Sequence, residues 1–203
     1  MSNPPDLQQL RDAITCGDPG RSMPALVALR EAGVEEAVPL LLLGLEQEEF
    51  LVRSLSCAGL GVKRNEAGWQ ALAAALEHDP DSNVRAEAAN SLVSHGLERA
   101  WPLLLEAFRR DDHWLLRCSV LSAVAEHPEA CSEKLLELAS LAVDAGDGTV
   151  RVGGAEILGR LVKQGQEGTD GGEIAAAARG MLQRLQADAD HRVVAAALNG
   201  LQG

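Results

Sequence analysis

Four arginines recur at nearly constant spacing and form the most regular polar feature of the chain. Each follows an apolar residue, and Arg53, Arg85, Arg117 and Arg151 are separated by 32, 32 and 34 residues. A guanidinium can pair with a loop carboxylate through two hydrogen bonds, or it can bind an anionic ligand. Because acidic residues recur just before the arginines, we expect a structural ladder in which each arginine ties its own or a neighbouring acidic loop.

The other residue types that perform chemistry show no catalytic or metal-binding arrangement. The four cysteines lie far apart without a CxxC pair, which removes the usual spacing for zinc or a redox dithiol. We expect them to be small buried thiols. No Ser, Cys or Lys is placed beside both a base and an orienting acid, as a nucleophilic enzyme requires. The sequence therefore predicts no catalytic, cofactor-binding or metal-binding residue and no bound cofactor.

Composition limits the partners and the compartment. The 203 residues include 18 Lys and Arg against 30 Asp and Glu, a net charge of -12, with 46% apolar and only 2% aromatic residues. This acidity argues against a nucleic-acid partner, whose phosphates need a basic surface. The longest apolar run, at 37–45, is too short to span a bilayer, for which about twenty residues are needed. The first ten residues lack the features of a signal peptide, so we expect a cytoplasmic protein.

The arginines belong to repeated units that each contain two helical patterns. A Leu- and Ala-rich helix precedes a short acidic loop, and a second helix opens at the apolar–Arg pair, as in DSNVRAEAANSL at 81–92. Val194 and Ser22 stand at the arginine position in the last and first copies. We expect one HEAT-like repeat domain over 1–203. Its predicted units are 4–33, 34–64, 65–96, 97–128, 129–163 and 173–203, with a flexible Gly-rich loop at 164–172.

The second helices are expected to pack through small residues. The predicted inward face in the third unit consists of Val84, Ala88, Ala89 and Leu92, and in the second unit of Val52, Ser56, Cys57 and Leu60. Small side chains let neighbouring helices approach closely. Gly33 and Gly96 fall where a helix ends, and we expect both to be C-cap glycines.

Units of about 32 residues with two antiparallel helices predict an all-α fold, a right-handed α-solenoid of about six HEAT-like two-helix repeats. The third unit carries an Asp, then Val-Arg, then Ala-Ala and Leu, at Asp81, Val84, Arg85, Ala88, Ala89 and Leu92. In this pattern the chain resembles the HEAT-like repeats of the phycobilisome (PBS) lyase type. The middle units also look like a cyanobacterial HEAT-repeat protein.

Several functions are compatible with such a solenoid. A complete solenoid without a catalytic constellation favours a non-catalytic scaffold or adaptor that binds a protein partner. The resemblance implies an alternative, a subunit of a bilin (phycobilin) lyase or a factor in phycobilisome assembly or degradation, although the chain has no Tyr and few rings to hold a tetrapyrrole. A second alternative is an accessory protein in cofactor or iron–sulfur cluster assembly. Whether the chain is an enzyme is left open, with the non-enzymatic interpretation favoured.

One tryptophan departs from the repeat pattern. Trp114 lies three residues before Arg117, where the other units have Phe50, Ser82, Gly148 and His191, so the fold does not require a large ring there. Aromatic residues are favoured anchors at interfaces. The loop acids, repeated once per unit, predict an acidic ridge for a basic or phycobiliprotein-related protein partner. The candidate partner-binding residues, on this ridge and on the concave second-helix face, are Trp114, Asp111, Asp112, Asp79, Asp81, Glu87, Asn90, Ser119, Ser122, Glu156 and Asn199.

Overall fold

The computed structural model describes residues 6–128, 130–167 and 172–202, and every regular element in these ranges is helical. The helices form two compact units, Met1–Ala107 and Phe108–Gly203. No helix in the described ranges is long and apolar enough to cross a membrane.

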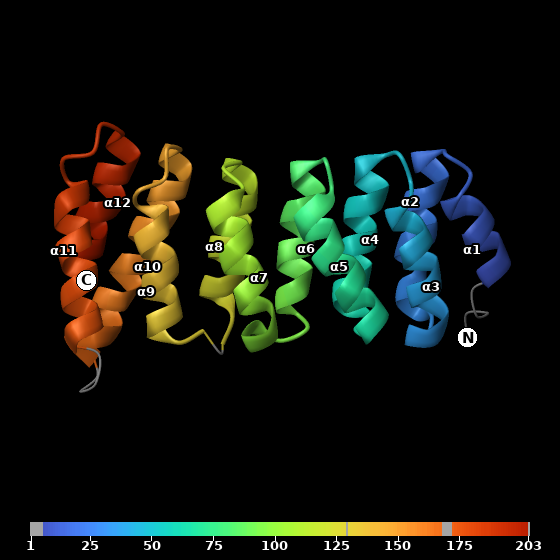
Figure 1. The fold of residues 1–203 in the computed structure, drawn as a ribbon, viewed down its shortest axis with the longest axis horizontal. Coiled ribbons are helices and arrows are strands. Elements are labelled where there is room, and N and C mark those ends of the chain that lie inside the picture. The colour runs from blue at the N-terminus through green and yellow to red at the C-terminus, as the bar shows by residue number, and fades with distance from the viewer. Residues whose placement is uncertain (1–5, 129, 168–171, 203) are drawn as a thin grey trace. The chain divides into compact units, whose positions relative to one another are not determined.

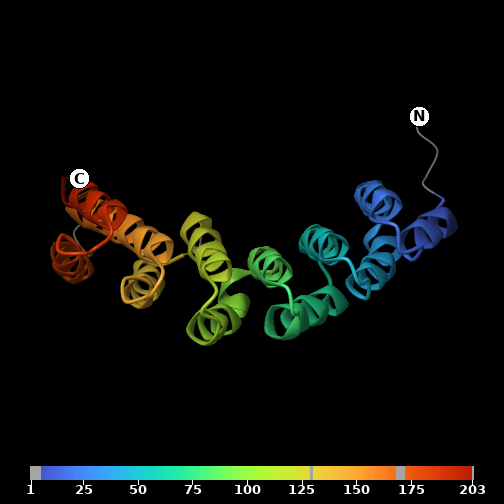
Figure 2. The same cartoon turned by 90° about the horizontal axis from the view of Figure 1, so that it is seen from above.

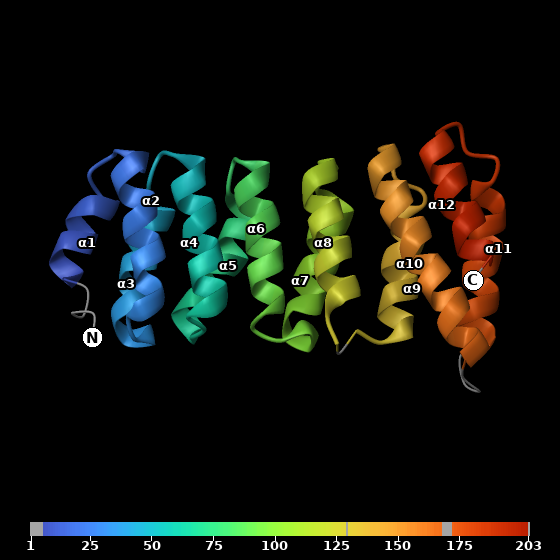
Figure 3. The ribbon, with the colours of Figure 1, turned by 180° about the vertical axis from the view of Figure 1, so that it is seen from behind.

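In the first unit, first and second helices alternate along the chain and occupy two layers (Figures 1 and 2). The second helices α2, α4 and α6 lie side by side in chain order, as the view from behind shows (Figure 3). The elements of this unit are α1 (Leu7–Ile14), α2 (Pro19–Ala28), the 3-10 helix η1 (Leu29–Glu31), α3 (Val34–Leu45), α4 (Phe50–Val62), α5 (Glu66–His78), α6 (Ser82–Val93) and most of α7 (Leu97–Arg110).

The second unit also consists of helix pairs, and its longest helix is α10. Its central element is α10, which packs against α8, α9, α11 and α12. The helices that begin in this unit are α8 (Trp114–Glu126), α9 (Ser132–Ala142), α10 (Gly148–Glu167), α11 (Gly172–Leu185) and α12 (His191–Gln202).

One helix pair lies in each of the six predicted ranges, but the predicted Gly-rich loop at 164–172 is wrong at both ends. Residues 164–167 continue α10, and Gly172 is the first residue of α11. A single glycine costs a helix about 1 kcal/mol, and the neighbouring Gln and Glu are good helix formers, so an established helix continues through this stretch. The remainder, 168–171, lies outside the described residues. That the six pairs form a single domain stays a prediction.

The predicted inward faces are confirmed. The four residues of α6 and the four of α4 are all buried. The Ser56 hydroxyl, fully buried, donates to the Val52 carbonyl at 2.8 Å, which satisfies its polar group within the helix.

The two glycines expected to be C-caps behave differently. Gly96 has a φ of +117°, in the region that favours glycine, and it ends the turn after α6. Gly33 has a φ of -66° and is the N-cap of α3, so the C-cap prediction is wrong there. The Gly33 amide donates to the Glu36 carboxylate at 3.1 Å, and this contact begins the next helix instead of ending the last one.

Neighbouring second helices approach closely where both carry small residues. A Cβ placed on Gly159 of α10 would lie 2.8 Å from the Cα of Gly200 on α12. In the first unit, a Cβ on Gly61 of α4 would lie 3.0 Å from the Ser91 side chain on α6. The contact between Gly159 and Gly200 is made by backbone atoms, so no side chain can move to make room for a Cβ. The close packing of α10 against α12 therefore requires glycine at both positions.

We expect Gly159→Ala to destabilise the protein. Overpacking costs about 1–3 kcal/mol, and the better helix propensity of alanine returns about 1 kcal/mol of this. The matched control is Gly180→Ala in α11, where an added Cβ meets nothing within 4 Å. This control should stabilise the protein by up to about 1 kcal/mol. Urea denaturation followed by circular dichroism measures both, and a stabilised Gly159→Ala variant would contradict the close helix contact.

Candidate functional site

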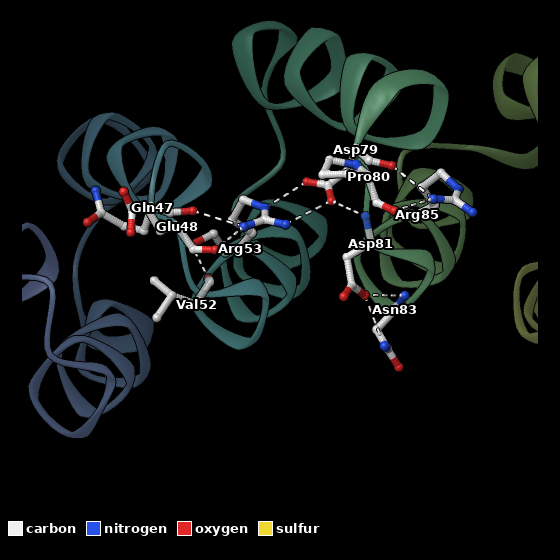
Figure 4. Close-up of polar contacts among 10 residues, drawn as sticks. Gln47, Glu48, Val52, Arg53, Asp79, Pro80, Asp81, Asn83 and Arg85 are labelled. Carbon is white, nitrogen blue, oxygen red and sulfur yellow. Dashed lines mark hydrogen bonds and ion pairs between the residues drawn. The ribbon is translucent and has the colours of Figure 1, made fainter.

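The most ordered polar contact of the first unit joins two consecutive repeats through Arg53. Its Nε and Nη2 donate to the two carboxylate oxygens of Asp79 in the next loop, at 2.8 and 3.0 Å (Figure 4). Its Nη1 donates to the carbonyls of Gln47 and Glu48 in its own loop, at 3.0 and 2.7 Å. The hydrogen bond and charge of Asp79 raise the pKa of Arg53 against the opposing effect of burial. One guanidinium therefore holds two loops together.

The same geometry recurs at Arg151 in the second unit. Its Nε and Nη2 donate to Asp188 at 2.8 and 2.9 Å, and its Nη1 donates to the carbonyls of Ala145 and Gly146. The Arg151 hydrogen bond, followed by the Asp190 amide, lowers the pKa of Asp188. Arg53 and Arg151 thus both pair with the carboxylate of the following repeat's loop.

The third unit shows how an arginine contacts its own loop. Arg85 Nη1 donates to the carbonyls of Asp79 and Pro80 at 2.9 and 3.1 Å (Figure 4). Asp81, four residues before Arg85, instead accepts the Asn83 amide at 2.8 Å as the N-cap of α6. The contact of an arginine with its own loop is therefore made to backbone carbonyls.

Arg117 departs from this pattern. Its Nε donates to the carbonyl of Phe108 at 3.1 Å, and its guanidinium lies over the Phe108 ring at 5.5 Å. The loop of the following repeat has Ala145 at the position that Asp79 and Asp188 occupy in other loops, so the carboxylate that pairs with Arg53 and Arg151 has no counterpart there. The contacts of Arg117 thus differ from the ion pairs with the following repeat that Arg53 and Arg151 make.

The last repeat has a local substitute for its missing arginine. Val194 stands at the ladder position, and Arg192 instead pairs with Asp190 of its own loop, with Nη2 and Oδ2 2.7 Å apart. The Arg192 side chain and then its amide lower the pKa of Asp190 to about 2. This pair stays within one repeat.

Trp114 lies at the surface of the second unit. Its side chain is the first of α8 and is 46% exposed. Its ring stacks on His113 with centroids 6.2 Å apart, and His113 Nδ1 accepts the Leu115 amide at 3.3 Å as the N-cap. The indole thus lies at a capped helix start, directly after a loop that contains the half-buried Asp111 and the exposed Asp112.

The other candidate partner-binding residues fall into two groups. The first group already has partners within the protein. Asp79 is 10% exposed and its carboxylate pairs with Arg53, and Asp81 is the N-cap of α6. Glu87 is half-buried, and burial raises its pKa despite a hydrogen bond from Ser91. Side chains that are exposed or partly exposed on the second helices, and so remain available, are those of Asn90, Ser119, Ser122, Glu156 and Asn199.

The cysteines only partly follow the expected burial. Cys57 is buried, and desolvation raises the pKa of its thiol to about 12, while burial also raises the pKa of Cys118. These two thiols are therefore protonated at neutral pH and are poor nucleophiles. Cys16 and Cys131 are exposed, so the expectation of four buried thiols is wrong: both lie outside the helices that form the core. Among the described residues, no three His, Cys, Asp or Glu side chains group to hold a metal ion.

The sequence did not predict a second set of contacts, in which cations bind backbone carbonyls at helix ends away from the acidic loops. Lys63 Nζ donates to the carbonyls of Arg30 and Ala32 at 2.8 and 2.6 Å, and Arg64 Nη1 donates to the Ser94 carbonyl at 2.8 Å. In the second unit Arg160 donates to the Ala125 carbonyl. These cations bind carbonyls at the C-terminal ends of neighbouring helices, where the helix dipole favours positive charge. Cations near the ends of the predicted units 34–64 and 129–163 were the available signal in the sequence.

Comparisons with known proteins agree on the fold. Residues 38–125 match the family described as HEAT repeats. A crystal structure of an engineered protein, a structural-genomics target, is 19% identical with a TM-score of 0.54, over 98% of this chain and 96% of that chain. A designed armadillo repeat protein is 16% identical with a TM-score of 0.58, over 97% and 99%. No curated protein matches the sequence.

These likenesses, at less than 25% identity, concern the fold alone. They confirm the predicted all-α solenoid of two-helix repeats. The phycobilisome-lyase type and the cyanobacterial lineage stay predictions.

We expect Arg53→Ala to lower the free energy of unfolding by about 2 kcal/mol, because the variant leaves the Asp79 carboxylate without its charged donor. The control is Arg109→Ala, which removes an ion pair with Glu137 between side chains 48% and 43% exposed. Such exposed pairs contribute below about 1 kcal/mol. Urea denaturation of both variants tests this difference, and equal losses would contradict a special role for Arg53.

Asp190→Asn should reduce the acid sensitivity of the protein. The folded-state pKa of Asp190, about 2, lies below the ordinary carboxyl value. Its contribution to stability is therefore complete above about pH 4 and is lost as the pH falls through about 2. Asparagine keeps a capping oxygen for the Arg192 amide but carries no charge.

The measurement is the urea midpoint of both proteins between pH 2 and 7. The wild-type protein should be the more stable at neutral pH, and the difference should shrink toward pH 2. A difference independent of pH would contradict the assignment of the acid sensitivity to Asp190.

Proposed function

We propose that the protein is a non-catalytic repeat scaffold or adaptor that binds a protein partner through the α7–α8 loop. The single observation behind this proposal is the exposed Trp114, held at the start of α8 where the repeat itself needs no ring. Tryptophan is strongly enriched among the residues that dominate binding energy at protein interfaces.

The chemistry around Trp114 indicates the kind of partner. Asp112 is exposed two residues before Trp114, and the net charge of the chain is -12. An indole face attracts Lys and Arg, and neighbouring carboxylates strengthen that attraction. The favoured partner is therefore a protein segment with basic side chains, and its binding should weaken as salt is added. Ser122, eight residues after Trp114 on α8, is also exposed.

We expect Trp114→Ala to weaken partner binding about thirty-fold, which corresponds to about 2 kcal/mol for a dominant interface residue. Its thermal midpoint should stay within a few degrees of wild type, because the ring is not part of the core. The control is Leu198→Ser, which removes another exposed apolar side chain of the second unit. The measurement is affinity capture from an extract of the source cells with the three proteins.

A protein captured by wild type and Leu198→Ser but lost with Trp114→Ala supports the proposal. Identical captured sets for all three proteins would overturn the role of Trp114. The bilin-handling alternative leads to another result, a red-shifted bound spectrum on incubation with bilin or transfer of pigment to an apo-phycobiliprotein. The identity of the captured protein also tests the alternative of an accessory role in cofactor or iron–sulfur assembly.

A further inference from the structure

A small apolar pocket lies between α2 and α4 in the first unit, away from the acidic loops. Its volume is about 90 Å³, and its apolar walls include Leu26, Val27, Leu55 and Val62. Val27 and Val62 are 44% and 66% exposed, so two aliphatic side chains flank an opening to solvent. A cavity flanked by two exposed aliphatic side chains can accept the apolar side chain of another molecule.

Two cations stand at the same pocket. Lys63 is the C-cap of α4, and its two hydrogen bonds to the carbonyls of Arg30 and Ala32 fix the ammonium at the end of α2 and η1. The Arg30 side chain is exposed and also lines the pocket. Among the described residues that line it, none carries a carboxylate. In a chain of net charge -12, this is a local positive site next to an apolar one.

The size of the pocket selects among apolar groups. A cavity of about 150 Å³ accepts benzene. At about 90 Å³ the pocket is smaller than that cavity and suits a branched aliphatic side chain better than an aromatic ring. The equivalent groove of the second unit, between α10 and α12, is lined by Glu156 and Asn199 and lacks the aliphatic rims. The pocket is thus a property of α2 and α4 and not of every repeat.

We propose that this pocket binds a partner protein segment in which an aliphatic residue, of the size of leucine, lies next to a carboxylate. The aliphatic side chain enters between Val27 and Val62, and the carboxylate accepts hydrogen bonds from Arg30 and from the remaining Lys63 proton. Charge complementarity excludes a basic segment from this pocket. The inference rests on the proposed binding role, but it uses a different surface and partner chemistry from the loop with Trp114.

The experiment uses N-acetyl-L-leucine as the probe and follows backbone amide signals of the whole protein by NMR. A ligand of this size should bind with a dissociation constant in the millimolar range. We expect saturable shifts for amides of residues 26–30 and 58–63. Two related compounds separate the contributions: N-acetyl-L-leucinamide lacks the carboxylate, and N-acetylglycine lacks the aliphatic side chain. Each should bind at least five-fold more weakly.

Variants then locate the site. Val62→Ser and Arg30→Gln change exposed side chains and should each weaken N-acetyl-L-leucine binding at least three-fold. The matched control is Leu51→Ser, which alters an exposed leucine of the same helix outside the pocket and should leave binding unchanged. Absence of saturable shifts at these residues, equal binding of N-acetylglycine, or insensitivity to Val62→Ser would overturn the proposal. None of these outcomes depends on Trp114, so failure here is distinct from failure of the proposed function.

Discussion

Close approach of neighbouring second helices is the constraint on which the rest of the structure depends. A two-helix repeat cannot cover its own apolar face, so the next repeat must cover it. The contacts of Gly61 with Ser91 and of Gly159 with Gly200 leave no room for large side chains between these helices. The 2% aromatic content is therefore a consequence of packing. Trp69, an aromatic residue of the core, lies on a first helix, where the Arg99 guanidinium covers its ring at 4.0 Å.

In a stack of this kind, the amide and carbonyl groups at the helix ends need partners from outside the helix. Acidic side chains bind the amides, and basic side chains bind the carbonyls. At the N-terminal ends of the second helices, carboxylates such as Asp81 and Asp190 accept amide hydrogen bonds. At the C-terminal ends, Lys63 and Arg160 donate to carbonyls of the neighbouring repeat. Both choices follow the helix dipole. Carboxylates thus gather in the loops before the second helices, and cations bind the carbonyls at C-terminal helix ends.

Spacing along the chain revealed the repeat, the arginine ladder and the buried faces, because a helical period and a recurring motif are local properties. The partner of each arginine was not predictable from spacing. Arg53 lies only four residues after Glu49 but pairs with Asp79, 26 residues away, because the angle between repeats brings that loop to the guanidinium. The same holds for Lys63 and the Ala32 carbonyl. Sequence alone predicted a loop at 164–167 because this stretch is close to several glycines. A helix that is already formed can continue through one glycine at a small cost, and α10 does so.

Departures from the repeat are where function can be separated from folding, because the other repeats show what the fold requires. Asp79 and Asp188 each hold the arginine of the preceding repeat, whereas Ala145 releases Arg117 from that task. Trp114, three residues before Arg117, exposes nearly half of its ring, an arrangement that adds little to stability. Ala145 lies in the loop before α10, but Arg117, which it leaves without this carboxylate, lies with Trp114 in the first turn of α8. The binding role that we propose for Trp114 accounts for the exposed ring, which packing does not.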